Sequence, residues 1–273
     1  MRIAIYIGKE EFLTDQRVVS LVAELDEGGC DTYYAAASGE IKEDTDMLLS
    51  IGGDGTFLKA AMIAFEKSLP VTGVNLGRMG FLSENRPEEF AQAVLSGDYT
   101  VENRAILKAD VQTGNPEIDG CPYALNEMTI RRNGAAMLSI DVSVDGIDLP
   151  TYWGDGIIIS TSSGSTAYSL SVGGPIVSPN AECLVIAPIA PHTLTMRPLI
   201  IPNNVKLRIR PQSRNQHHFL TLDNRSYTVP NGCEFHISKA EKSIILILLQ
   251  NNSFYRTLRN KMMWGVDKRD NHS

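Results

Sequence analysis

MLLSIGGDGT, residues 47–56, is the stretch that decides the fold. Its first five residues form a short apolar run typical of a buried strand, and the glycines that follow favour a tight turn. Residues 57–67 then place Ala, Leu and Met at helix-forming positions. The stretch therefore predicts a strand, a glycine turn and a helix, a geometry that aims backbone N–H groups at a bound phosphate.

Similar alternation surrounds this stretch. The helix predicted at 14–26 carries an amphipathic stripe and ends at Gly28-Gly29, and the later helix begins at Pro87 with acids in its first turn. The strands predicted in this half lie at 2–7, 31–36 and 71–76. Such an order predicts an N-terminal α/β domain, residues 1–100, with a parallel sheet covered by helices.

From about Val101 the pattern changes to short runs with period-two alternation. Residues 139–144 alternate and meet Asp145-Gly146, a type I′ hairpin signal because both turn residues need positive φ. Further strands are predicted at 157–160, 205–209, 219–222, 234–237 and 243–249. We expect a mostly-β C-terminal domain at 101–251, and a helix-compatible stretch at 253–264 within a segment, 252–273, that packs back on the first domain.

Composition narrows the function classes. The chain has 273 residues, 43% hydrophobic and 21% charged, with a formal net charge of −7. No overall basic field favours nucleic acid or an anionic membrane as a partner. The aliphatic run 244–249 is far shorter than the roughly 20 residues that span a bilayer, and neither a signal peptide, a C-x-x-C pair nor an H-E-x-x-H motif occurs. We expect a cytoplasmic protein without structural zinc or disulfides.

Asp54 is the unusual residue of the glycine turn. The turn matches neither the Walker A loop nor the dinucleotide fingerprint. An acid within a phosphate cradle is unfavourable unless the carboxylate takes a proton from an attacking hydroxyl or helps to hold a divalent cation. The structural alternative is an aspartate that only caps the helix.

Two further polar features stand out. The run 154–177 is dense in Ser and Thr around residues 160–166, which suits hydrogen bonding to sugar and base edges, although a solvated surface loop is the alternative. A serine-hydrolase elbow is not supported, because G-x-S-x-G is absent there. Asn126-Glu127 is a polar pair inside the strand-like stretch 123–130.

Three motifs, taken in their order along the chain, resemble the signature motifs of the NAD kinases. They are GGDGT at 52–56, Asn126-Glu127, and GSTAYS at 164–169 with GGP at 173–175. The likeness covers nearly the whole chain. The first motif is shared with phosphofructokinases and with diacylglycerol and sphingosine kinases, whereas the third is close to diagnostic. The resemblance implies an α/β domain, a β-rich NAD-binding domain and an active site between them.

The resemblance also implies an activity. The protein would be a phosphotransferase with an alcohol acceptor, moving the γ-phosphoryl group of ATP to the 2′-hydroxyl of the adenosine ribose of NAD to form NADP. A divalent cation, Mg²⁺, would accompany the ATP phosphates with no metal site fixed by the protein. The implied partners are the small molecules NAD and ATP, and the implied assembly is a homodimer or homotetramer with a pocket edge donated by a neighbour.

Residue roles follow from the same likeness. Asp54 would accept the 2′-hydroxyl proton, Asn126 and Glu127 would hold ribose hydroxyls, and Asp155 would accept a bond from the nicotinamide carboxamide. Lys59 would offer charge to phosphate, although an exposed helix lysine is the alternative. The full implied nucleotide and substrate site, besides the catalytic Asp54, is Gly53, Gly55, Thr56, Lys59, Phe81, Asn126, Glu127, Asp155, Ser163, Thr166, Ala167, Tyr168, Ser169, Leu170 and Ser171.

Departures from the family pattern leave alternatives open. Ser162 stands where the family usually has proline, Trp153 stands where many members have arginine, and Arg225 is either a site residue or a surface residue. The rival functions are a sister kinase that phosphorylates a lipid or sugar hydroxyl, and a non-catalytic NAD-binding regulatory protein. The sequence leaves open whether polyphosphate replaces ATP and whether NADH is accepted.

Overall fold

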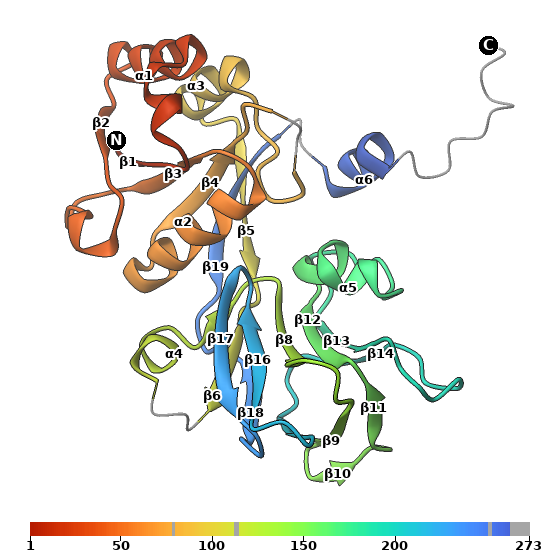
Figure 1. The fold of residues 1–273 in the computed structure, drawn as a ribbon. Helices are drawn as coiled ribbons and strands as arrows, with labels where there is room; N and C mark the ends of the chain where they lie inside the picture. Colours follow the sequence, from red (N-terminus) through yellow and green to blue (C-terminus); the bar gives the residue numbers. More distant parts are fainter. Residues whose placement is uncertain (78–79, 112–114, 251–252, 263–273) are drawn as a thin grey trace, which may run out of the picture. The chain divides into compact units, whose positions relative to one another are not determined.

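The computed structural model describes residues 1–77, 80–111, 115–250 and 253–262. The chain divides into two compact units, Met1–Asn103 with Ile244–Ser273, and Arg104–Ser243. Figure 1 traces the elements of both units along the sequence. None of the helices in these ranges is both long enough and apolar enough to cross a membrane.

The first unit is built on a six-stranded sheet in the order β2-β1-β3-β4-β19-β5. Its strands are β1 (Arg2–Ile7), β2 (Asp31–Tyr34), β3 (Met47–Ile51), β4 (Pro70–Val74), β5 (Tyr99–Arg104) and β19 (Ile244–Leu249). The pairings β1 with β2, β1 with β3, β3 with β4 and β4 with β19 are all parallel. The parallel sheet predicted from the βα alternation is confirmed.

Helices cover both faces of this sheet. The covering helices are α1 (Gln16–Glu27), α2 (Asp54–Lys67) and α3 (Pro87–Ser96). The same unit contains α6 (Phe254–Met262) and the short 3-10 turns η1 (Glu10–Thr14) and η2 (Ser38–Glu40). Figure 1 shows α1 beside α3, and their apolar residues share one buried cluster with β1, β3 and β4. Helix α2 packs against β3, β4 and β19. The sequence signals act as expected, because α3 begins at Pro87 and stops at Gly97, whose φ is 76°.

One sequence-based boundary differs from the structure. The limit at 251 placed residues 244–249 in the β-rich domain, yet β19 pairs with β4 in the α/β unit. Its run of Ile and Leu lacks alternation, as is typical of a strand buried on both faces of a parallel sheet, and such a run carries no sign of which sheet it joins. Helix α6 belongs to the same unit. Residues 263 and 264 of the predicted C-terminal helix lie outside the described residues.

The second unit consists of two antiparallel sheets. Their orders are β10-β9-β15-β18-β6-β7, with β11 also paired to β9, and β14-β13-β12-β8-β16-β17. The strands are β6 (Leu107–Val111), β7 (Tyr123–Ala124), β8 (Glu127–Arg132), β9 (Leu138–Val144), β10 (Ile147–Asp148), β11 (Tyr152–Gly154), β12 (Gly156–Thr161), β13 (Cys183–Ile189), β14 (Leu199–Pro202), β15 (Leu207–Gln212), β16 (His217–Leu222), β17 (Arg225–Pro230) and β18 (Phe235–Lys239). Short helical segments are α4 (Pro116–Gly120), η3 (Ser163–Thr166) and α5 (Tyr168–Ser171).

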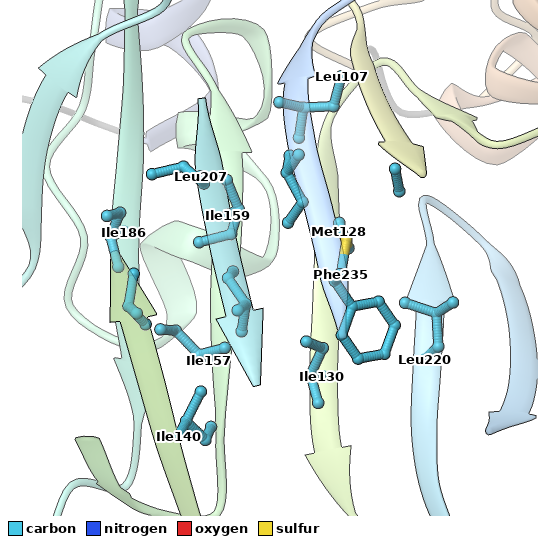
Figure 2. Packing of buried hydrophobic residues seen from close by; sticks show 14 of the residues in the cluster. Leu107, Met128, Ile130, Ile140, Ile157, Ile159, Ile186, Leu207, Leu220 and Phe235 are labelled. Carbon is cyan, nitrogen blue, oxygen red and sulfur yellow. The ribbon is translucent and has the colours of Figure 1, made fainter. Parts of the chain in front are cut away.

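A single buried cluster joins the two sheets of this unit. Figure 2 shows Ile130 and Ile157 of one sheet packed in the same cluster as Ile140 and Phe235 of the other. Alternate residues of the longer strands, such as Ile157 and Ile159 of β12, point into it, which explains the period-two pattern in the sequence. The predicted hairpin turn is confirmed, since Asp145 and Gly146 link β9 to β10 with φ of 49° and 82°.

Candidate active site

The glycine turn lies between β3 and α2. Gly52 has a φ of 150°, and a Cβ there would lie 2.5 Å from Oγ1 of Thr56, so this position excludes larger residues. A Cβ at Gly53 or Gly55 would meet nothing within 4 Å. Thr56 therefore fills the space beside Gly52, whereas the space beside Gly53 and Gly55 is open. An open N-terminus of a 14-residue helix suits an anionic ligand.

Asp54 is the first residue of α2, but its side chain does not cap the helix. The N-cap is Gly53, without a side-chain cap bond, and the Asp54 carboxylate accepts N–H bonds from the turn that follows β4. Phe81 N donates to Oδ2 at 2.9 Å, and Leu82 N and Ser83 N donate to Oδ1 at 3.2 and 3.0 Å. The capping alternative is thus wrong. The carboxylate is held by backbone groups, and its side chain remains 33% exposed.

Gly80 makes this arrangement possible. A Cβ at Gly80 would lie 1.6 Å from Oδ1 of Asp54, so only glycine lets the backbone approach the carboxylate this closely. Phe81, predicted as a site residue, contributes its backbone N–H to Asp54, while its ring packs 6.3 Å from the ring of Phe254. Lys59 lies exposed on α2, and the two interpretations of this lysine remain open.

Asn126 and Glu127 are both buried, at 7% and 8% exposure. Asp223 holds their backbone: it accepts the N–H of Leu125 at 2.8 Å, of Asn126 at 2.7 Å and of Glu127 at 3.2 Å. Its own N–H donates to the carbonyl of Glu127 at 2.9 Å. Asp223 is a positioning residue that the sequence analysis missed. Its place between two strands, before Asn224, is typical of a plain turn, and no sequence spacing links it to residue 126.

Four buried polar atoms in the predicted motifs have no hydrogen-bond partner. They are Asn126 Oδ1, Glu127 Oε2, Ser163 Oγ and Ser169 Oγ. Burying a polar group without a partner costs about 1–3 kcal/mol, so such atoms are seldom left unsatisfied without a functional reason. An amide and a carboxyl that both need partners suit a vicinal diol, which donates and accepts at once. This cluster is the candidate sugar-binding part of the site.

The electrostatics of Glu127 support a ligand-binding group. Burial, and secondly the charge of Asp223, raise its pKa to about 8, while a backbone hydrogen bond from Tyr168 acts in the opposite direction. Burial also raises the pKa of Asp223, against the effect of its three N–H donors. Glu127 is therefore largely protonated near pH 7 without ligand, and its carboxyl can donate as well as accept.

We expect stability to fall with pH because of Glu127. Its pKa is about 8 in the folded chain and about 4.5 unfolded, so between these values the unfolded chain binds fewer protons and the free energy of unfolding decreases as pH rises. Between pH 5 and pH 8 the loss amounts to up to about 4 kcal/mol. Urea unfolding at both pH values measures it, and Glu127→Gln removes most of the fall.

The exposed Glu182 supplies the control for this experiment. Glu182→Gln leaves the pH dependence of unfolding as in the wild type. Equal slopes in wild type and Glu127→Gln would show that Glu127 titrates normally in the folded chain.

The hydroxyl-rich run is a buried structural turn as well as a candidate binding surface. Ser162, Ser163 and Ser165 are 3%, 8% and 0% exposed, so the solvated-loop alternative is wrong. Thr161 Oγ1 donates to the carbonyl of Leu125 at 2.6 Å, and Ser165 Oγ donates to that of Val177 at 3.1 Å. Several of the hydroxyls that suggested sugar binding therefore bond to backbone instead.

Glycine and serine fix the course of this turn. A Cβ at Gly164 would lie 2.2 Å from the carbonyl oxygen of Asn126, which ties the turn to the Asn126-Glu127 pair. Ser162, in the place of the usual proline, donates its hydroxyl to the carbonyl of Pro179 at 2.9 Å. That hydrogen bond restrains the loop, as the ring of a proline would otherwise do. Among the other predicted residues, Thr166, Ala167, Tyr168 and Leu170 are half-buried and Ser171 is exposed.

Asp155 lies apart from this cluster. It precedes β12, whereas the hydroxyl turn follows that strand, and six extended residues span about 20 Å. Its carboxylate pairs with Arg132 at 2.9 Å, and both side chains are about one-third exposed. Arg225, the other weakly indicated residue, donates to the carbonyls of Cys121 and Tyr123 and so braces β7. Within one chain, the structure does not bring Asp155 to the unpartnered cluster.

Across the described ranges, no group of three His, Cys, Asp or Glu side chains is placed to hold a metal ion. The Asp54 carboxylate, the strongest potential ligand at the glycine turn, accepts three backbone bonds, one at Oδ2 and two at Oδ1.

An α/β unit with an acid-bearing glycine turn at a helix N-terminus, and an antiparallel β unit with buried polar groups that lack partners, are what a two-domain nucleotide-dependent kinase would need. The family model described as the ATP-NAD kinase N-terminal domain matches residues 7–97, and that of the ATP-NAD kinase C-terminal domain matches residues 125–249. The chain belongs to the ATP-NAD kinase family.

Curated relatives agree with this assignment. The chain is 41% identical over 245 residues to an NAD kinase of Flavobacterium psychrophilum, which covers 88% of this chain and 83% of that protein. It is 43% identical over 230 residues to an NAD kinase of Bacteroides fragilis, with 83% and 79% covered.

Solved structures share the fold. An NAD kinase from Archaeoglobus fulgidus in complex with ATP is similar with a TM-score of 0.77 at 27% identity, over 96% of this chain and 99% of that chain. Yeast NADH kinase complexed with NADH has a TM-score of 0.85 at 23% identity, over 98% and 88% of the two chains. The predicted fold class, α/β followed by mostly β, is confirmed.

Proposed function

We propose that this protein is an NAD kinase that transfers the γ-phosphoryl group of ATP to the 2′-hydroxyl of the adenosine ribose of NAD, forming NADP and ADP. Membership of the ATP-NAD kinase family supports the reaction. The structural observation that carries the proposal is the Asp54 carboxylate, fixed by three backbone N–H groups at the open N-terminus of α2. A carboxylate in a phosphate cradle is otherwise unfavourable.

In the reaction, the 2′-oxygen attacks the γ-phosphorus. The new O–P bond forms as the bond from the γ-phosphorus to the β,γ-bridging oxygen breaks, ADP departs, and the hydroxyl proton passes to Asp54. Oδ2 of Asp54 accepts one backbone bond and Oδ1 accepts two. Because each carboxylate oxygen has two lone pairs, Oδ2 is the atom with capacity for this proton.

The remaining predicted residues bind and orient. Gly53, Gly55 and Thr56 shape the turn that binds phosphate, and Lys59 adds positive charge beside that phosphate. Asn126 and Glu127 bind the ribose hydroxyls. Two of the unpartnered atoms, on Ser163 and Ser169, gain partners from the bound nucleotide. The other predicted lining residues are Phe81, Thr166, Ala167, Tyr168, Leu170 and Ser171. Such positioning is the main contribution a protein makes to phosphoryl transfer.

Mg²⁺ binds together with ATP in this proposal. When bound to the phosphates, it neutralises charge that builds up during transfer. That the protein fixes no metal site of its own stays a prediction. The cytoplasmic location inferred from the sequence stays a prediction.

We further propose that the working enzyme is a homodimer or homotetramer. The distance of Asp155 from the unpartnered cluster along β12 supports a pocket edge supplied by a neighbouring copy, where Asp155 accepts a bond from the nicotinamide carboxamide. Size exclusion with light scattering tests this. A dimer or tetramer is expected, and a monomer that retains full activity would refute it.

The test of the function is direct. Purified protein is mixed with ATP, Mg²⁺ and NAD, and NADP is detected with an NADP-specific dehydrogenase, beside parallel reactions with lipid and sugar acceptors. We expect NADP from NAD and no product from the other acceptors. Phosphorylation of a lipid or sugar instead would assign the protein to a sister kinase, and NAD binding without any NADP would favour a regulatory protein.

A further inference from the structure

A cation from the C-terminal helix stands beside Asp54. Lys261 Nζ of α6 lies 4.0 Å from Oδ2 of Asp54, with side chains 39% and 33% exposed. Helix α6 lies beyond both regions matched by the family models, which end at residues 97 and 249. Neither the motifs nor the matched domains therefore assign any function to this lysine.

Two further contacts join α6 to Phe81, one from Lys261 and one from Phe254. Its ammonium lies 4.4 Å from the centroid of the Phe81 ring, a cation–π contact, and Phe254 of the same helix packs against that ring at 6.3 Å. Phe254 and Lys261 are about two helical turns apart, so both lie on one face of α6. Phe81 is also the residue whose N–H donates to Oδ2 of Asp54. The helix thus binds the same turn that holds the carboxylate.

The geometry at Oδ2 distinguishes this pair from a simple salt bridge. A separation of 4.0 Å is too long for a hydrogen bond, so Lys261 supplies charge without occupying the lone pair. Among the described residues, Lys261 is the charged side chain that pairs with Asp54. The oxygen with capacity for the substrate proton is therefore the one that faces the ammonium.

We propose that Lys261 is a positioning residue for the phosphoryl transfer, whose charge orients the Asp54 carboxylate so that Oδ2 receives the 2′-hydroxyl proton. This inference rests on the proposed NAD kinase function. Lys261 acts through Asp54, so its removal lowers the rate of transfer rather than the affinity for NAD. An isolated, partly exposed ion pair contributes little to stability, and the folded chain does not depend on it.

The experiment compares three variants in the NADP-forming assay. Lys261→Met keeps the aliphatic stem and removes the charge, Lys261→Arg keeps the charge, and Arg259→Met removes an exposed charge from the same helix. We expect Lys261→Met to lower kcat roughly tenfold with KM for NAD within about twofold. Lys261→Arg restores most of kcat, and Arg259→Met behaves as wild type.

A double-mutant cycle completes the test. If Lys261 acts through the Asp54 carboxylate, Lys261→Met causes no further loss in an Asp54→Asn background. A full additional loss there, equal losses in the Lys261→Met and Arg259→Met variants, or failure of arginine to rescue would each overturn the proposal. Absence of NADP formation by the wild type would instead refute the kinase function itself, so the two failures are distinguishable.

Discussion

Asp54→Asn is expected to cut turnover by roughly two to four orders of magnitude while leaving NAD binding largely intact. The amide has the size of the carboxylate but accepts the substrate proton far less readily. It also turns an NH₂ group toward one of the N–H donors of residues 81–83, at a cost of about 1–3 kcal/mol in stability. Coupled-assay kinetics measure kcat, and calorimetry measures the affinity for NAD.

The control for this variant is Asp98→Asn, an exposed acid in the same unit. It should retain wild-type kcat and unfolding temperature. Turnover of Asp54→Asn within about threefold of wild type would remove Asp54 as the proton acceptor, because general base catalysis contributes at least about a hundredfold.

Gly164→Ala is expected to disable the candidate sugar-binding cluster. The added Cβ would lie 2.2 Å from the carbonyl oxygen of Asn126 and 2.5 Å from its carbon, and backbone atoms cannot move aside as a flexible side chain can. Either the hydroxyl turn or the Asn126-Glu127 pair must shift. We expect NADP formation, as kcat/KM, to fall about a hundredfold, since displacements near 1 Å cost this much. Overpacking also lowers the free energy of unfolding by about 1–3 kcal/mol.

A matched glycine serves as control. A Cβ at Gly120 would meet nothing within 4 Å, so Gly120→Ala should preserve both kcat/KM and stability. If Gly164→Ala kept kcat/KM within a few-fold of the wild type, close packing of the turn against Asn126 would have no bearing on substrate binding.

Local sequence signals determined much of the fold. Three such signals act only on neighbouring residues, and the structure has each predicted feature at the predicted position. They are the glycine turn, the proline that begins α3 and the Asp145-Gly146 hairpin. The sheet to which β19 belongs was harder to predict, because its Ile and Leu residues indicate burial but not a partner strand. Its pairing with β4 joins residues 175 positions apart, such as Ile245 and Pro70, and local periodicity contains no information on such contacts.

The candidate site divides in the same way. Asp54 stood out as a candidate because an acid in a glycine turn conflicts with its local surroundings. The polar pair Asn126-Glu127 says little by its position in a strand, and only the family resemblance gave it a role. Asp223 and Lys261 could not be identified from the sequence, since an aspartate in a turn and a lysine on an exposed helix are ordinary at their positions. Their contacts with residues 125–127 and with Asp54 exist only in three dimensions. Conversely, Ser165 suggested sugar binding but bonds to backbone.

The position of β19 has a consequence for how the protein is made. The central sheet of the α/β unit contains a strand from the last 30 residues, and β5 lies beyond it at the sheet edge. While a ribosome is still synthesising residues before Ile244, β4 has an open edge and β5 has no neighbour. The β unit, formed by the continuous stretch Arg104–Ser243, is complete earlier. The α/β unit thus finishes folding after the β unit, and the nascent chain exposes an aggregation-prone strand edge until β19 has been synthesised.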